Sequence, residues 1–184
     1  EPKTLDVAFD VIGDIVLSAA SQQYGGFTVP EADKILSKYA ARSYDKYMEK
    51  YRALGLDEAR CEEETIKDLE NDFHQGFQGW EYKFNTVASS RGDYPFFSAA
   101  SASSTPLALA AATASASSEM ASKSMLAVRR GGQGKKWCKK PVLFPKLVFL
   151  YDENLHGEGG ELEDVFEAGV DCSQRSMYPD WLSL

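Results

Sequence analysis

The chain has 184 residues, of which 43% are hydrophobic, and a formal net charge of −8 at pH 7. This length and composition predict one domain with a single good core. The negative charge argues against non-specific nucleic-acid binding, which needs a concentrated basic face. No apolar run approaches the ~20 residues that span a bilayer, and the start does not resemble a secretion signal. Three scattered cysteines indicate a reducing, cytoplasmic compartment rather than a disulfide framework.

The first part of the chain reads as three amphipathic helices. Thr4 and Asp57 suit the N-caps of the first and third helices, and Pro30 suits the first turn of the second. Gly76 and Gly79 weaken the third helix, either because another part of the chain packs close to them or because they are merely tolerated. The third helix also carries large apolar residues at steps of three and four, which predicts packing against a neighbouring helix or a partner subunit: Ile66, Leu69, Phe73, Phe77, Trp80 and Phe84.

Residues 139–152, KKPVLFPKLVFLYD, form the run around which we expect the fold to be organised. Their apolar residues do not alternate with polar ones, which predicts a strand buried on both faces beneath covering helices. Residues 94–97 begin a second strand-like piece, and further helices are predicted from Glu119 and from Glu161. Helices alternating with few strands indicate an α/β fold, mainly helical, that forms part of a larger barrel.

Ser98–Ser118 is a low-complexity tract of Ala, Ser, Thr, Leu and Pro. Its clustered serines and Pro106 argue against a stable helix, so a flexible, disordered or aberrant segment is predicted. An out-of-frame reading of a GC-rich gene would produce such a tract. Because the chain begins without Met and stops abruptly at Leu184, residues 1–184 are expected to be an internal fragment of one larger domain.

The histidines and cysteines do not predict a metal site or a nucleophile. His74 and His156 are far apart in sequence, and no CxxC or HExxH spacing occurs. We expect His74 to be partly buried and His156 to be solvated in a Gly-rich loop. No base is identified beside Cys61 or Cys172, which predicts packed or exposed thiols. The GGQGK run at 131–135 offers N–H groups for a phosphate but lacks the P-loop spacing, which favours a connector.

The best functional candidate is the loop Ser89-Ser90-Arg91-Gly92. Two hydroxyls, a guanidinium and a glycine follow a helix and precede a strand, and together they can bind a phosphate or a base edge. The alternative interpretation is an ordinary surface turn. Loops that join buried elements often carry binding sites, which favours the functional interpretation.

Five stretches, in order, resemble the large subunit of the anaerobic (class III, glycyl-radical) ribonucleoside-triphosphate reductases. They cover almost the whole chain except Ser98–Ser118, and they are residues 1–6, 24–36, 75–96, 140–157 and 172–183. The resemblance implies a partial fragment of the ten-stranded α/β barrel that surrounds the active site in that family.

That family converts ribonucleoside triphosphates to deoxyribonucleotides by glycyl and thiyl radical chemistry. The resemblance implies a glycyl radical and a structural zinc in the whole enzyme, with no cofactor in this fragment. It also implies nucleotide effectors, a radical-SAM activating enzyme and a homodimer as partners, and neither nucleic acid nor membrane. The loop Ser89–Gly92 resembles the segment that relays effector identity to the substrate base.

The chain also departs from the family pattern. The glycyl-radical motif and the zinc-binding cysteine cluster are absent, and the catalytic cysteines would lie before Glu1 and after Leu184. We therefore assign no catalytic residue among Cys61, Cys138 and Cys172, and we expect the fragment to be inactive alone. Two alternatives are a nucleotide-binding module that dimerises through its Ile66–Phe84 stripe, without catalysis, and a purely structural helical protein.

Overall fold

The computed structural model describes residues 1–23, 25–88, 92–101, 111–135 and 138–184. The fold is mixed α/β and mainly helical, as the sequence predicts. Its helices are α1 Leu5–Gln22, α2 Ala32–Ala53, α3 Glu58–Thr86, α4 Ala111–Gly131, α5 Glu153–His156 and α6 Glu163–Ser176. Its strands are β1 Phe27–Val29, β2 Phe97–Ser101, β3 Gln133–Lys135, β4 Cys138–Lys140, β5 Lys146–Tyr151 and β6 Asp180–Ser183.

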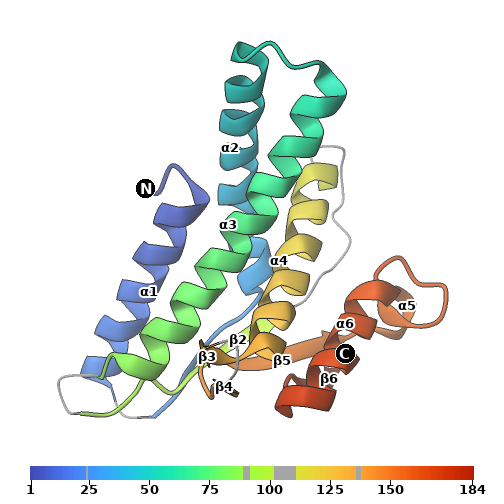
Figure 1. Ribbon diagram of the computed structural model, residues 1–184. Coiled ribbons are helices and arrows are strands. Elements are labelled where there is room, and N and C mark those ends of the chain that lie inside the picture. Colours follow the sequence, from blue (N-terminus) through green and yellow to red (C-terminus); the bar gives the residue numbers. More distant parts are fainter. Residues whose placement is uncertain (24, 89–91, 102–110, 136–137) are drawn as a thin grey trace.

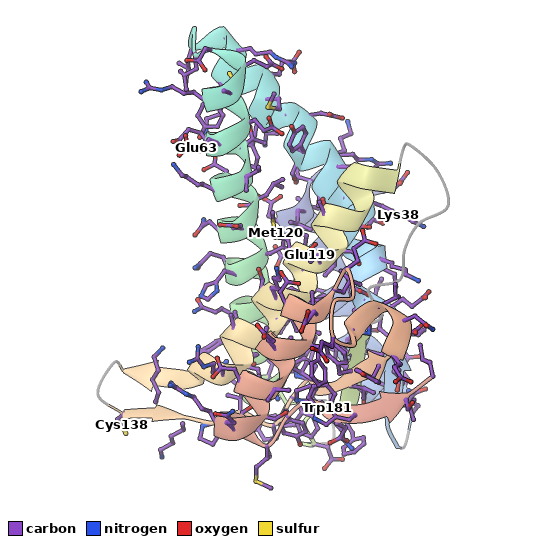
Figure 2. The ribbon with its side chains drawn as sticks, turned by 90° about the vertical axis from the view of Figure 1, so that its right-hand side faces the viewer. Lys38, Glu63, Glu119, Met120, Cys138 and Trp181 are labelled. Atoms are coloured by element: carbon purple, nitrogen blue, oxygen red, sulfur yellow. The ribbon has the colours of Figure 1, made fainter. Side chains whose placement is uncertain are left out.

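Four strands form one parallel sheet in the order β1-β2-β5-β6, and β3 and β4 form a separate antiparallel hairpin. In the parallel sheet, Ala99 of β2 pairs with Leu147 of β5, and Phe149 of β5 pairs with Trp181 of β6. Helices α1 to α4 rise from the sheet, and α2 and α3 extend furthest from it (Figure 1). In the view of Figure 2 the hairpin, with Cys138 labelled, projects sideways from the foot of α4.

The prediction for residues 139–152 is correct in part. Lys146–Tyr151 is an inner strand of the sheet, and Leu147 and Phe149 are 1% and 2% exposed towards the helices. Burial of the whole run on both faces is wrong, because Val148 is only half-buried on the opposite face and Leu143 is 63% exposed. Residues 138–140 belong to the exposed strand of the hairpin. Pro145 has no N–H for a sheet ladder and thereby separates the two parts of the run.

Helix α3 contributes many large side chains to the core. The apolar stripe predicted for it is buried apart from Ile66. Asp57 caps the helix as predicted, because its side chain accepts a hydrogen bond from the Arg60 N–H over 3.0 Å. Phe9 of α1 packs edge-on against Trp80 at 4.9 Å, and the indole N–H of Trp80 donates to the Phe9 carbonyl at 2.8 Å. Packing against neighbouring helices is thus confirmed. Dimerisation through the Ile66–Phe84 stripe is wrong, since the chain itself covers the stripe.

The two glycines of α3 have different environments. A Cβ added to Gly76 would lie 2.3 Å from ring atoms of Phe9, so glycine is needed where α1 crosses α3. A Cβ on Gly79 would meet no atom within 4 Å. Gly76 therefore serves close packing, and Gly79 is merely tolerated.

Both ends of the Ala/Ser tract belong to regular structure, which corrects the prediction of a flexible segment there. Residues 98–101 lie in β2 and residues 111–118 lie in α4, and residues 102–110 are outside the described part. Ser118 and Ser122 of α4 donate hydrogen bonds of 3.0 and 3.4 Å to the carboxylate of Asp33, which is 1% exposed. Small side chains let α4 pack closely on α2, and this packing outweighs the low helix propensity of serine.

Candidate functional site

A buried polar network joins α4 to the segment that leads into β5. Arg129 of α4 is 1% exposed, and its Nε donates to Oε1 of Glu81, on α3, over 2.6 Å. The same guanidinium donates to the carbonyls of Val142, at 3.2 Å, and of Pro145. Its centre also lies 5.3 Å from the ring of Tyr178. Residues 142–145 are therefore fixed by a cation that α3 and α4 hold between them.

Asn85, one turn after Glu81, fixes the same segment from α3. Its Nδ2 donates to the Phe144 carbonyl at 2.6 Å, and its Oδ1 accepts from the N–H groups of Leu143 and Phe144 at 3.2 Å each. The last turn of α3 is thereby bonded to residues 143 and 144, just before β5. Any displacement of this helix end is expected to reach the strand through these bonds.

Burial dominates the electrostatics of Glu81. Desolvation raises the pKa of its carboxyl group, and the guanidinium of Arg129 opposes that rise. Within the described residues, Oε2 of Glu81 is buried and has no hydrogen-bond partner. One oxygen of this carboxylate is therefore available to a further donor.

The predicted relay loop follows this helix end. Ser89, Ser90 and Arg91 lie outside the described residues, whereas Gly92 is exposed with φ +85°, a left-handed backbone that favours glycine. After the loop, the Phe96 carbonyl accepts a hydrogen bond from the Phe27 N–H at 3.1 Å, and this bond joins the segment before β2 to β1. The described flanks of the loop thus join the end of α3 to the beginnings of β1 and β2.

His156 is buried, so the prediction of a solvated histidine is wrong. Its side chain is 2% exposed, its Nδ1 accepts from the Asp152 N–H at 3.0 Å, and its ring lies 5.0 Å from that of Phe149. Burial lowers the pKa of this imidazole. The prediction failed because residues 153–156 form a helical turn, which brings the His156 ring back against Phe149 of β5.

The remaining histidine and the two buried cysteines lie as the sequence predicts. His74 is half-buried, Cys61 and Cys172 are buried, and burial raises the pKa of the Cys172 thiol. Gly132 and Gly134 have φ values of +63° and +121°, and the GGQGK run leads from the end of α4 into strand β3. In the described part of the chain, no group of three or more His, Cys, Asp or Glu side chains is placed to hold a metal ion.

Comparison with protein families identifies the chain. The family model for "Anaerobic ribonucleoside-triphosphate reductase" matches residues 1–184. The chain belongs to this family. Curated relatives of that name are 31% identical in Enterobacteria phage T4 and 30% identical in Escherichia coli strain K12. Each alignment covers 99% of this chain but only 28% and 24% of those relatives, so the chain spans about a quarter of their length.

The sequence of this reductase-family chain did not lead us to predict the buried network of Glu81, Asn85 and Arg129. A signal for Glu81 exists, because Phe77, Glu81 and Phe84 fall on one helical face and an acid on an apolar face implies a buried partner. Nothing local in the sequence points to Arg129 as that partner.

The helices in the described part of the chain include none with the length and hydropathy of a membrane span.

Proposed function

We propose that the chain forms part of the catalytic subunit of an anaerobic ribonucleotide reductase, which converts ribonucleoside triphosphates to deoxyribonucleotides. The single observation that carries this proposal is the family match over residues 1–184. The relatives in phage T4 and Escherichia coli carry the reductase name, and each aligns with 99% of this chain. The activity would belong to the longer protein, with this chain as one segment of it.

The sheet supports a place in the ten-stranded α/β barrel of the family. Its four strands are parallel, and the described helices pack on the face that holds Leu147 and Phe149. The opposite face carries Val148 and Leu150, which are only half-buried. In the proposed barrel these side chains would face the interior, and further strands would continue the sheet beyond β1 and β6.

The glycyl radical and the structural zinc are assigned to other parts of the whole enzyme. Cys61 lies on α3, Cys138 on β4 and Cys172 on α6, so the cysteines of this chain do not form the cluster that a structural zinc site requires. The zinc therefore does not fit the residues present here.

The proposed role of this segment is the relay of effector identity to the substrate base by Ser89, Ser90, Arg91 and Gly92. Hydroxyl and guanidinium donors suit a phosphate or a base edge. The network at Asn85 supports this role, since it fixes the helix end from which the loop departs. A change in the loop would act on β2 directly, and on β5 through the helix end.

The partners follow from the same assignment. They are a ribonucleoside triphosphate, nucleotide effectors, a radical-SAM activating enzyme and a second subunit in a homodimer, all in the cytoplasm. Each requires the longer reductase subunit for its test.

Product formation tests the proposed function. The reductase subunit that carries this segment is activated anaerobically by its activating enzyme and is supplied with a ribonucleoside triphosphate and formate or a thiol reductant. Deoxynucleotide is expected from this subunit and not from the 184-residue chain under the same conditions. Absence of product from the activated subunit, or its formation by the chain alone, would contradict the proposal.

A further inference from the structure

The two flanks of the proposed relay loop meet at a single residue, Phe144. Asn85 precedes the loop, and its carboxamide donates to the Phe144 carbonyl at 2.6 Å and accepts from the Phe144 N–H at 3.2 Å. Phe96 follows the loop, and its ring lies 5.6 Å from the Phe144 ring with 69° between the planes, an edge-to-face contact. Phe144 thus holds one flank through its backbone and the other through its side chain.

The ring of Phe96 is held by few contacts, although it is 55% exposed. A Cβ on Gly26 would lie 2.3 Å from the Cδ1 atom of this ring, so the ring packs directly on the backbone before β1. The ring of Phe144 is its aromatic neighbour. Because solvent surrounds much of the Phe96 ring, removal of the Phe144 ring would leave its orientation to the contact with Gly26.

Phe144 itself is fixed by the buried charge pair. The guanidinium of Arg129 donates to the carbonyls of Val142, at 3.2 Å, and of Pro145, which lie on either side of Phe144. Glu81 holds that guanidinium over 2.6 Å, and both side chains are buried. Backbone groups that are bonded on both sides of a residue leave it little freedom to move. Phe144 is therefore a fixed point against which both flanks of the loop are set.

We infer that Phe144 is a positioning residue for substrate selection. It fixes the end of α3 and the start of β2 relative to each other, and thereby places the loop that joins them. A small misplacement of residues that contact a substrate has a large effect on reactivity, so the orientation of both flanks matters. This inference deepens the proposed function and rests on it.

The ring of Phe144 can be tested apart from its backbone, because the bonds to Asn85 use backbone atoms that every variant except proline retains. Phe144→Ala and Phe144→Leu are introduced into the reductase subunit that carries this segment, and Phe144→Leu retains apolar volume should the alanine variant fail to fold. The reduction of two competing ribonucleoside triphosphates is measured with dATP and with dTTP as effector. Exchange of the effector is expected to change the product ratio about tenfold less in both variants than in the unmodified subunit.

Two further variants separate positioning from general stability. Phe144→Tyr keeps the ring and is expected to restore the response to the effector. Phe166→Ala removes a half-buried ring that contacts Tyr151 and Trp181 at 5.3 and 5.4 Å, away from the loop. It is expected to respond as the unmodified subunit does. Equal losses in Phe144→Tyr and Phe144→Leu, or an equal loss in Phe166→Ala, would overturn the inference.

Arg91→Ala, measured beside these variants, distinguishes this inference from the proposed function. A weakened response in Arg91→Ala with a full response in Phe144→Leu overturns the positioning role of Phe144 and leaves the proposed function intact. A full response in both variants overturns both. A weakened response in Phe144→Leu alone supports the positioning role and contradicts the proposed role of the Arg91 side chain.

Discussion

The guanidinium of Arg129 lies 2.6 Å from the carboxylate of Glu81, and both side chains are removed from solvent at the junction of α3 and α4. Two charges buried together require each other, since either one left alone would carry the full cost of desolvation. Arg129 also holds the backbone at residues 142–145. The pair therefore connects the helical layer to the strand at the centre of the chain.

Removing one member of this pair is expected to destabilise the fold strongly. Arg129→Met should lower the free energy of unfolding by about 3–5 kcal/mol, because Glu81 then loses its counter-charge in a buried position. The double variant Arg129→Met/Glu81→Leu should lose less than the sum of the single losses. Urea denaturation measures both. Strict additivity would show that the two side chains are not coupled.

The two glycines of α3 provide a matched comparison on one helix. Gly76→Ala places a methyl group against the ring of Phe9 and should cost about 1–3 kcal/mol of stability. Gly79→Ala meets open space and should add about 0.5–1 kcal/mol through helix propensity. Thermal unfolding of the two variants should therefore shift in opposite directions. A shift of the same sign in both would contradict the packing of α1 on α3.

Phe149 marks the buried face of β5. Phe149→Ala should cost about 3–5 kcal/mol, because the ring is buried among Trp181, His156 and Gly169. The control Leu143→Ala, at a side chain that is 63% exposed, should cost far less. If Phe149→Ala cost below about 1 kcal/mol in folded protein, the core would be misplaced.

The buried His156 predicts a dependence of stability on pH. Because burial lowers its pKa below the ordinary value of 6.5, the unfolded chain takes up a proton first as the pH falls. The stability contributed by the neutral imidazole is thus complete above pH 6.5, decreases below it, and stops decreasing below the folded-state pKa. The free energy of unfolding of His156→Asn, followed by chemical denaturation, should lack this component. If the free energies of unfolding of the unmodified chain and of His156→Asn differed by the same amount at every pH from 6.5 downward, the predicted contribution of His156 would be contradicted.

The sequence predicted elements whose signals are local and missed those that depend on distant contacts. The stripe of α3 is evident because large residues recur at helical spacing. Strand β1 has three residues, and none of them is fully buried. It is defined by its pairing with β2, including Phe27 with Phe97, which no local pattern reports. The end of the tract that lies in α4 was misjudged for a similar reason, since the contact between Ser118 and Asp33 joins residues far apart in the sequence.

The candidate site divides in the same way. The spacing and chemistry of Ser89–Gly92 made the loop visible, whereas its supports at Asn85 and Arg129 come from separate helices and appear only in three dimensions. A buried acid such as Glu81 is detectable as a charge on an apolar helix face. Its partner is not, because nothing in the sequence states which helix will cover that face.

The most direct test of the account is the selectivity of the reductase subunit that carries Arg91→Ala. The relative reduction of the ribonucleoside triphosphates is measured with dATP, dGTP or dTTP as effector, beside a control Arg60→Ala at the far, exposed end of α3. Arg91→Ala is expected to weaken the dependence of substrate choice on the effector, whereas Arg60→Ala is expected to preserve it. An unchanged effector dependence in an active Arg91→Ala enzyme would contradict the relay role of this segment.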